Sequence, residues 1–260
     1  MIRIWLFVCF TLGTTLTMRA EEEKEILFVR HAESEFNTFR FKKILYGLDS
    51  IFGLNVMKKD VDLTEKGVID SLLLKNNQIL QEAVLDADTV VMASTLVRSI
   101  HTAIFALANS EGHLPKKLHV HQSLQEVGVL WGETEYVVPD SIPETPANAF
   151  PSLRAGVPGY SFLTKTYANI QDHLQIYPYD AGDFFDQKLS SFSRFIFDSQ
   201  VANKRVIVFG HSNWLREFFR FLDPSSPYAQ QKIPNCALLR FKLHRSDDGI
   251  LQLKDAQDPI

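Results

Sequence analysis

Short apolar runs alternate with amphipathic stretches along most of the chain. Residues 25–30, 88–93 and 205–209 are almost uninterrupted runs of apolar side chains, which is typical of strands buried on both faces. Two further short strands are predicted over residues 118–121 and 237–243. Strands that are apolar throughout favour a sheet that is covered by other elements on both sides.

Amphipathic periodicity predicts helices between these strands. The helical patterns cover residues 64–80, 96–108, 184–199 and 213–222. Thr64 is a good N-cap for the first of them, and position 34 and its neighbours can open another helix. The alternation of strands and helices indicates an α/β fold, a three-layer sandwich with a mainly parallel central sheet flanked by helices.

One region, residues 127–183, interrupts this alternation. It holds most of the prolines together with mixed turn signals, and it is too long for a simple connection. We expect it to form a cap-like insertion within a single domain of residues 21–260.

The first twenty residues differ in composition from the rest. Arg3 precedes an apolar stretch over residues 4–17, which is shorter than the roughly 20 residues that a membrane-spanning helix needs. Ala20 offers a cleavage position before a polar run. The pattern favours a cleaved signal peptide over residues 1–20, and hence a protein of the secretory pathway or a secreted one. A membrane anchor retained over residues 4–17 is the alternative.

The overall composition is that of an ordinary globular protein. Hydrophobic residues make up 45% of the 260 and charged residues 22%, so extended disorder is not expected. The net charge of −4 does not suggest the basic surface that binding to nucleic acid requires. Only two cysteines, Cys9 and Cys236, are present, which excludes a disulfide framework.

Charged and nucleophilic side chains follow three of the predicted strands. The first strand ends in Arg30 and His31, Arg98 lies one helical turn beyond the second, and His211 follows the strand 205–209 closely. Ligands of open parallel sheets bind beyond the carboxyl ends of the strands. If these strands are neighbours, the four side chains converge at one edge of the sheet.

These residue types suit phosphoryl transfer. Guanidinium groups match the oxygens of a phosphoryl group, and a neutral imidazole can attack phosphorus to form phosphohistidine. A second, protonated imidazole can bind the phosphoryl oxygens. Glu126 follows the predicted strand 118–121 and is well placed to protonate the leaving group. No metal ion or other cofactor is expected, because arginines and histidines supply the positive charge.

Five segments of the chain resemble, in order, the signatures of the histidine phosphatase (phosphoglycerate-mutase-like) superfamily. They are LFVRHAESEFN at 27–37, DVDLTEKG at 60–67, STLVRSIHTA at 94–103, LQE at 124–126 and FGH at 209–211. The resemblance covers about residues 24–126 and 200–243. It implies a metal-independent phosphomonoester hydrolase that acts through a phosphohistidine intermediate.

The resemblance also implies a role for individual residues. His31 would be the nucleophile and Glu126 the proton donor. The residues implied in binding the phosphoryl group are Arg30, Asn37, Arg98 and His211. Two features depart from the superfamily pattern: Ala32 stands where glycine is usual, and the segment 41–59 is longer than the usual link. Substrate contacts in that segment cannot be carried over.

Two other functions are compatible with these residues. The phosphoglycerate mutases carry an N-E-R-H-Y-G run around the acid, whereas residues 125–130 of this chain read QEVGVL. That difference favours hydrolysis over a mutase reaction. A non-catalytic phosphate-binding or interaction module on the same fold would be expected to have lost one of the four central side chains, and His31, Arg98, Glu126 and His211 are all present.

The partner is expected to be a phosphorylated small molecule, with a phosphoprotein as the alternative. Contact with a membrane is expected only if the N-terminal segment is retained. The insertion contains two basic residues, Arg154 and Lys165, against seven acidic ones, Glu133, Glu135, Asp140, Glu144, Asp172, Asp180 and Asp183. This balance argues mildly against a highly phosphorylated polyanion as substrate.

A metal site has one sequence signal in its favour. His119 and His121 are two residues apart on a predicted strand, which places both rings on one face, as in some metal sites. No third ligand is evident from the sequence, so a pair of buried or exposed histidines is the favoured interpretation.

The targeting prediction can be tested on its own. Fusion of residues 1–24 to a reporter should direct its secretion with loss of the leader, because the apolar stretch ends before a cleavable position. Secretion and the N-terminal sequence of the released reporter are the measurements. A reporter that stays in the cytosol would contradict the prediction.

Overall fold

The computed structural model describes residues 22–34, 37, 63–109, 113–127, 174–177, 184–198 and 204–257. The predicted signal peptide, the helix expected after position 34 and most of the predicted insertion lie outside the described residues. So do Asp60 and Asp62 of the second signature segment.

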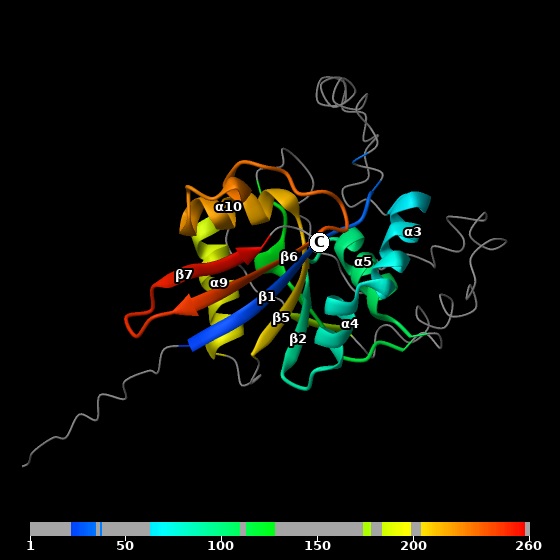
Figure 1. Ribbon diagram of the computed structural model, residues 1–260, viewed down its shortest axis with the longest axis horizontal. Helices are drawn as coiled ribbons and strands as arrows, with labels where there is room; N and C mark the ends of the chain where they lie inside the picture. Colours follow the sequence, from blue (N-terminus) through cyan, green and yellow to red (C-terminus); the bar gives the residue numbers. More distant parts are fainter. Residues whose placement is uncertain are drawn as a thin grey trace, which may run out of the picture.

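A seven-stranded sheet forms the centre of the described structure (Figure 1). Its strands are β1 (Glu22–Arg30), β2 (Thr89–Ala93), β3 (Leu118–His121), β4 (Leu174–Tyr177), β5 (Arg205–Gly210), β6 (Leu238–Arg245) and β7 (Leu251–Gln257). Their order across the sheet is β4-β3-β2-β5-β1-β6-β7. The first five of these pair in parallel, and β6 and β7 are added antiparallel at one side.

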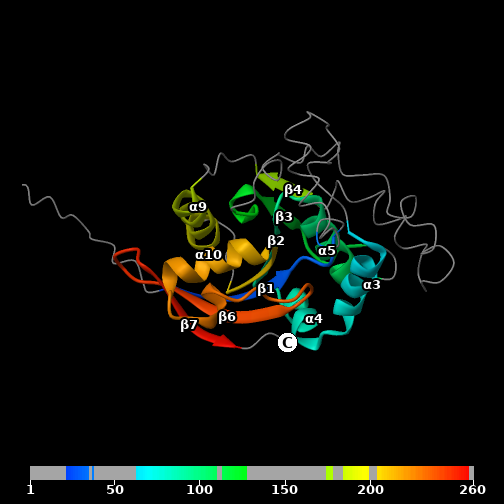
Figure 2. The ribbon, with the colours of Figure 1, turned by 90° about the horizontal axis from the view of Figure 1, so that it is seen from above.

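Helices cover both faces of this sheet (Figure 2). The helices on one face are α3 (Glu65–Leu73), α4 (Gln78–Leu85) and α5 (Val97–Leu107), and those on the other are α9 (Phe185–Asp198) and α10 (Ser212–Leu222). Three short 3-10 turns complete the described elements: η1 (Leu74–Asn76), η2 (Gln122–Leu124) and η4 (Pro227–Ala229). The structure therefore confirms the predicted three-layer α/β sandwich with a mainly parallel sheet.

The apolar runs read from the sequence are explained by this layering. In β1, Leu27 and Val29 belong to the buried cluster under α3, α4 and α5. The alternate residues, Ile26 and Phe28, belong to the cluster under α9 and α10. Successive side chains of a strand point to opposite faces, so a strand between two helical layers must be apolar at every position.

The structure differs from the sequence-based prediction in one helix. The pattern over residues 64–80 predicted one helix, and the structure has α3, η1 and α4 instead. Asn77 adopts an extended backbone, and its side chain caps α4 by accepting a hydrogen bond from Leu80 N at 3.0 Å. Starting a new helix leaves its first backbone N–H groups without partners, which costs free energy. The capping bond reduces this cost because it gives the N–H of Leu80 a partner.

Two strands were not predicted. β4 lies inside the segment expected to be purely an insertion, so residues 174–177 belong to the sheet. β7 is the edge strand next to β6, and most of its residues are exposed. An exposed edge strand needs no apolar run, so it leaves little hydrophobic pattern for the sequence to display.

Among the described residues no helix combines the length and apolar character that crossing a membrane requires.

Helix α3 docks on the segment that follows β1. Thr64 caps the helix, as predicted, by accepting a hydrogen bond from Gly67 N at 3.0 Å. The Thr64 backbone N–H donates to Glu33 O at 3.0 Å. A Cβ atom on Gly67 would lie 1.9 Å from that same carbonyl oxygen. Glycine is therefore required at position 67 by the close approach of the two backbones.

We expect Gly67→Ala to lower the free energy of unfolding by about 1–3 kcal/mol, as overpacking does. Helix propensity alone would favour alanine by about 1 kcal/mol, so the sign of the change tests the close contact. Urea denaturation is the measurement. Ile69→Ala is the control, because Ile69 is exposed on the same helix. A G67A variant as stable as the native protein would contradict the packing described.

Candidate active site

The carboxyl ends of three neighbouring strands define the candidate site. β5 lies between β2 and β1, so Ser94, His211 and His31, which follow these strands, lie at one edge of the sheet. The hydrogen-bond ladder continues one residue beyond the strands, with His31 N donating to Gly210 O at 2.9 Å and Ser94 N donating to Phe209 O at 3.0 Å. The convergence predicted from the strand ends is thus present.

Gly210 allows β5 to approach β1 at this edge. A Cβ atom on Gly210 would lie 2.8 Å from Cε2 of Phe28, closer than side chains pack. Phe28 is fully buried and cannot move aside easily. The glycine before His211 therefore has a packing reason that is independent of any ligand.

The His31 ring is buried and fixed in orientation. Its Nδ1 lies 2.7 Å from the carbonyl oxygen of Ala32, which can only accept, so Nδ1 carries the proton and Nε2 has the lone pair. The ring centroid is 5.0 Å from that of His211. Burial holds the pKa of His31 well below 6.5, and the positive charges of Arg98 and Arg30 add to the effect. A neutral imidazole with a lone pair on Nε2 is the form that can act as a nucleophile.

Ala32, which stands where the superfamily usually has glycine, fits the structure without distortion. The residue is completely buried within the apolar cluster under α3, α4 and α5. Its backbone N–H donates to Thr102 Oγ1 at 3.0 Å, and the Thr102 hydroxyl donates to Arg98 O at 2.7 Å. This chain of bonds ties the segment after His31 to the helix that carries Arg98.

Two arginines flank His31. Arg30 and Arg98 are both almost completely buried. Arg30 Nη1 donates to Ile233 O at 2.6 Å, and Arg30 Nε has no hydrogen-bond partner within the described part of the chain. Burial lowers the pKa of Arg30 to about 10, so the group is still charged at neutral pH. Two buried guanidinium groups at one edge form a site suited to an anion.

His211 is held by Ser94. Its Nε2 lies 2.8 Å from Ser94 Oγ, and the ring is completely buried. Burial, followed by the charge of Arg98, holds the pKa of His211 well below 6.5. The lowered pKa favours a neutral His211 ring, whereas the role expected from the sequence, binding of the phosphoryl oxygens, requires a protonated one. The arrival of a phosphate dianion beside it would favour protonation.

Glu126 approaches the site from a different part of the fold. It follows η2, and its Oε1 accepts hydrogen bonds from Trp214 N at 3.0 Å and Val127 N at 3.2 Å. Its Oε2 lies 3.9 Å from His211 Nδ1. The carboxylate is therefore beside His211, whose ring centroid lies 5.0 Å from that of His31.

Asn37 is part of the site, but its side-chain oxygen is engaged within the protein. Asn37 Oδ1 accepts hydrogen bonds from the backbone N–H and the hydroxyl of Ser34, both at 3.1 Å. Asn235 donates from Nδ2 to His31 O at 2.7 Å and lies 3.4 Å from Asn37 Oδ1. No pattern in the sequence points to Asn235, which reaches His31 from a loop more than 200 residues further along the chain.

His119 and His121 lie outside this site and pack in an aromatic cluster. Both rings contact Tyr177 and Phe195, at centroid distances between 5.1 and 5.7 Å. The two rings share a strand face, as their spacing predicted. Within the described residues no group of three or more potential metal ligands is present.

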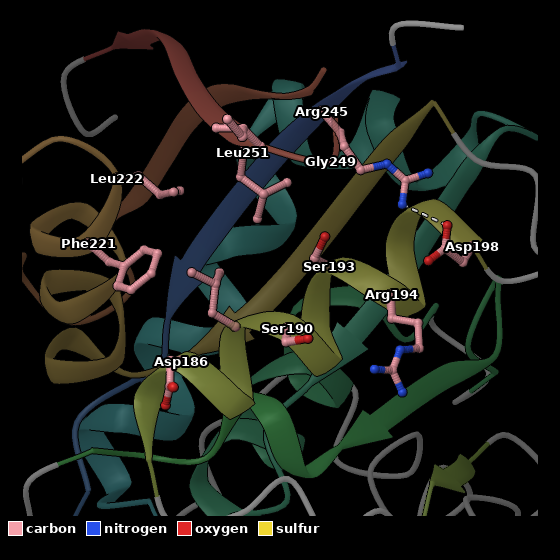
Figure 3. A pocket seen from close by; sticks show the side chains of 12 residues that line it. Asp186, Ser190, Ser193, Arg194, Asp198, Phe221, Leu222, Arg245, Gly249 and Leu251 are labelled. Carbon is pink, nitrogen blue, oxygen red and sulfur yellow. Dashed lines mark hydrogen bonds and ion pairs between the residues drawn. The ribbon is translucent and has the colours of Figure 1, made fainter. Parts of the chain in front are cut away.

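A groove of about 670 Å³ lies between α9, α10 and the β6–β7 turn (Figure 3). None of the residues predicted for the active site lines it. Arg245 at one end is paired with Asp198, and it also binds Glu22 outside the groove. The groove is therefore separate from the two histidines and carries no recognisable chemistry of its own.

Comparison with known proteins places the fold. No protein-family model matches the chain, and no curated protein matches its sequence. Its fold is similar to that of phosphoglycerate mutase from Bacillus anthracis, with 17% identity, a TM-score of 0.51 and coverage of 91% of this chain and 93% of that one.

Two other matched structures are phosphatases by name. Ecdysone phosphate phosphatase from Bombix mori is 18% identical, with a TM-score of 0.49 and coverage of 91% of this chain and 92% of that one. A putative alpha-ribazole-5'-P phosphatase from Escherichia coli is 16% identical, with a TM-score of 0.46 and coverage of 90% and 96%. At 17% identity the likeness to the mutase structure shows a shared fold, and this is the fold that the resemblance of the motifs implied.

The neutral histidines make stability depend on pH. Above pH 6.5 His31 and His211 are neutral in both folded and unfolded chains and contribute no pH dependence. Below pH 6.5 the unfolded chain binds protons that the folded site excludes, so the free energy of unfolding should fall by up to about 1.4 kcal/mol per pH unit for each histidine. Urea denaturation at pH 7.5, 6.5 and 5.5 measures the loss.

A matched variant assigns part of this loss to the site. Glutamine at position 31 cannot bind a proton in the unfolded chain. The stability of His31→Gln should therefore fall less steeply below pH 6.5 than that of the native protein. Ile69→Ala, at an exposed position, changes no titratable group and should leave the slope unchanged. Identical slopes for H31Q and the native protein would contradict a low pKa at His31.

Proposed function

We propose that this chain is a metal-independent phosphomonoester hydrolase of the histidine phosphatase superfamily, with His31 as nucleophile and Glu126 as proton donor. The observation that carries the proposal is the buried, neutral His31 ring, with its lone pair on Nε2, close to two buried arginines and beside His211. Membership of the superfamily is part of the proposal, and it is supported by the five ordered signatures and the shared fold.

In the first step, His31 Nε2 attacks the phosphorus atom of the bound monoester. A nitrogen–phosphorus bond forms as the bond from phosphorus to the leaving oxygen breaks, and the pair of electrons departs with that oxygen. Arg30 and Arg98 bind the phosphoryl oxygens, and their burial strengthens this interaction. Because amide donors bind Glu126 Oε1, the proton for the leaving oxygen is held on Oε2.

In the second step, water attacks phosphohistidine. Glu126, now ionised, accepts a proton from the water as the new phosphorus–oxygen bond forms, and the nitrogen–phosphorus bond breaks. Inorganic phosphate leaves, and both His31 and Glu126 return to their starting protonation states. The negative charge of a bound phosphate dianion raises the pKa of His211. The protonated ring then helps to hold the phosphoryl group during transfer.

Hydrolysis is favoured over a mutase reaction by the residues after Glu126. The run characteristic of phosphoglycerate mutases is absent, and residues 125–130 read QEVGVL instead. A mutase remains the second candidate, since a phosphoglycerate mutase is among the structures that share the fold. We propose a phosphorylated small molecule as substrate, with a phosphoprotein as the alternative, and a location in the secretory pathway or outside the cell.

The first experiment is hydrolysis of p-nitrophenyl phosphate by residues 21–260 in the presence of EDTA. Activity should survive EDTA, because arginines rather than a metal ion supply the positive charge. His31→Ala should lower kcat/KM at least about a thousandfold, since loss of a covalent nucleophile commonly costs more than that. Release of inorganic phosphate is the measurement.

His113→Ala is the matched control, because this histidine is exposed and lies away from the strand ends. Trapping of an acid-labile phosphoenzyme in the native protein, and not in H31A, would identify the intermediate. A phosphoenzyme that transfers its phosphate to an acceptor rather than to water would favour the mutase. Activity that persists in H31A would mean that another residue is the nucleophile.

A further inference from the structure

Trp214 makes two hydrogen bonds to the segment that carries the proton donor. Its backbone N–H donates to Glu126 Oε1 at 3.0 Å, and its indole Nε1 donates to Ser123 O at 2.7 Å. One residue therefore holds both the carboxylate and the chain three residues before it. The same residue lies three positions after His211, in the first turn of α10.

The indole ring is itself immobilised. Trp214 is 1% exposed, and it stacks on Phe218 at a centroid distance of 5.2 Å and meets Phe192 edge-on at 5.4 Å. It also lies parallel to the ring of Phe28, with the two ring centroids 6.0 Å apart. Phe28 stands two residues before Arg30 on β1. A ring packed on three sides has a single available orientation. The indole N–H is therefore fixed in direction relative to β1 and β5, the strands that precede His31 and His211.

Ser123 is held from its other side as well. His121 Nδ1 accepts a hydrogen bond from Ser123 N at 3.2 Å and lies 2.7 Å from its hydroxyl. Burial lowers the pKa of His121 to about 4, so the ring stays neutral and keeps its accepting nitrogen at neutral pH. Ser123 is thus held by His121 as well as by the indole N–H that its carbonyl accepts.

We propose that Trp214 is a positioning residue for the general acid, setting the Glu126 carboxylate relative to His31 and His211 through its indole bond to Ser123. The inference rests on the proposed function, in which Glu126 protonates the leaving oxygen. The need for it follows from topology. His31 and His211 are positioned by paired strands, whereas Glu126 extends from a loop after η2 and has no strand to fix it.

Trp214→Phe separates the two bonds. The backbone N–H to Glu126 is kept, while the indole N–H to Ser123 is lost and an aromatic ring still fills the core. General acid catalysis contributes about 10²–10⁴-fold, and it depends on hydrogen-bond distance to the leaving oxygen. A small displacement of Glu126 should therefore be visible in the rate of reactions that need a proton.

The readout is the dependence of kcat/KM on the leaving group. A series of phenyl phosphates from para-nitro to para-methoxy is used, because nitrophenolate departs without a proton and the methoxy analogue needs one. Glu126→Gln should raise the ratio of kcat/KM for the nitro substrate to that for the methoxy substrate by at least about tenfold. This threshold lies below the full contribution of a general acid. W214F should raise the ratio in the same direction, and W214F/E126Q should show no further rise over E126Q.

Phe219→Leu is the matched control. Phe219 is equally buried in α10, and its ring contacts Phe218, Tyr228 and Phe241 rather than Trp214. This variant should lose stability without changing the nitro-to-methoxy ratio, because a structural defect affects all substrates alike. A ratio in W214F equal to that of the native protein, while E126Q changes it, would overturn the proposal.

A second measurement does not depend on activity. In the native protein, the chemical shift of the backbone amide proton at position 214 should follow the ionisation of Glu126 as pH is varied, and E126Q should lack this response. W214F should weaken the response, because the backbone N–H is still present while the carboxylate is displaced from it. A response in W214F equal to the native one would overturn the role of Trp214. Absence of phosphatase activity in the native protein would instead overturn the proposed function, and the amide response would still decide the positioning role.

Discussion

The parallel pairing of β1 with β5 is the constraint on which the rest of the site depends. Its register places Arg30 opposite Gly210, so the next residue of each strand is a histidine. The 5.0 Å separation of the two rings follows from that register. A slip of one residue would turn the side chains of a whole strand to the opposite face, and both helical layers would oppose it because each strand is apolar on both sides. The packing of the sandwich and the geometry of the candidate site are therefore fixed by the same contacts.

Burial of positive charge gives the site its chemical character. Arg30 and Arg98 are withdrawn from water, and their fields add to desolvation in keeping His31 and His211 neutral. Burying these charges is costly, since they lose hydration. An arriving phosphate dianion would offset that cost and at the same time favour a proton on His211. In the proposed reaction, one electrostatic arrangement would serve both nucleophile activation and anion binding.

Glu126, the proposed proton donor, is fixed by different means from His31, the proposed nucleophile. The backbone ladder of the sheet positions His31 and His211, whereas the first turn of α10 and the Ser123 carbonyl position Glu126 through Trp214. Helix α10 begins at the residue after His211, so it couples the two parts directly. The amide donors at a helix N-terminus suit a carboxylate, and the hydrogen bond from one of them orients Glu126.

The sequence by itself determined the buried strands, the layer architecture and the candidate residues His31, Arg98, His211 and Glu126. These features are local, because apolar runs, helical periodicity and short signatures are written in neighbouring residues. Tertiary structure decided the strand order, the break between α3 and α4, and the inclusion of the edge strands β4 and β7. It also decided which group reaches the site from afar, such as Asn235, and that both histidines are neutral. Register, desolvation and the orientation of a buried indole depend on residues distant in sequence, so no local pattern can encode them.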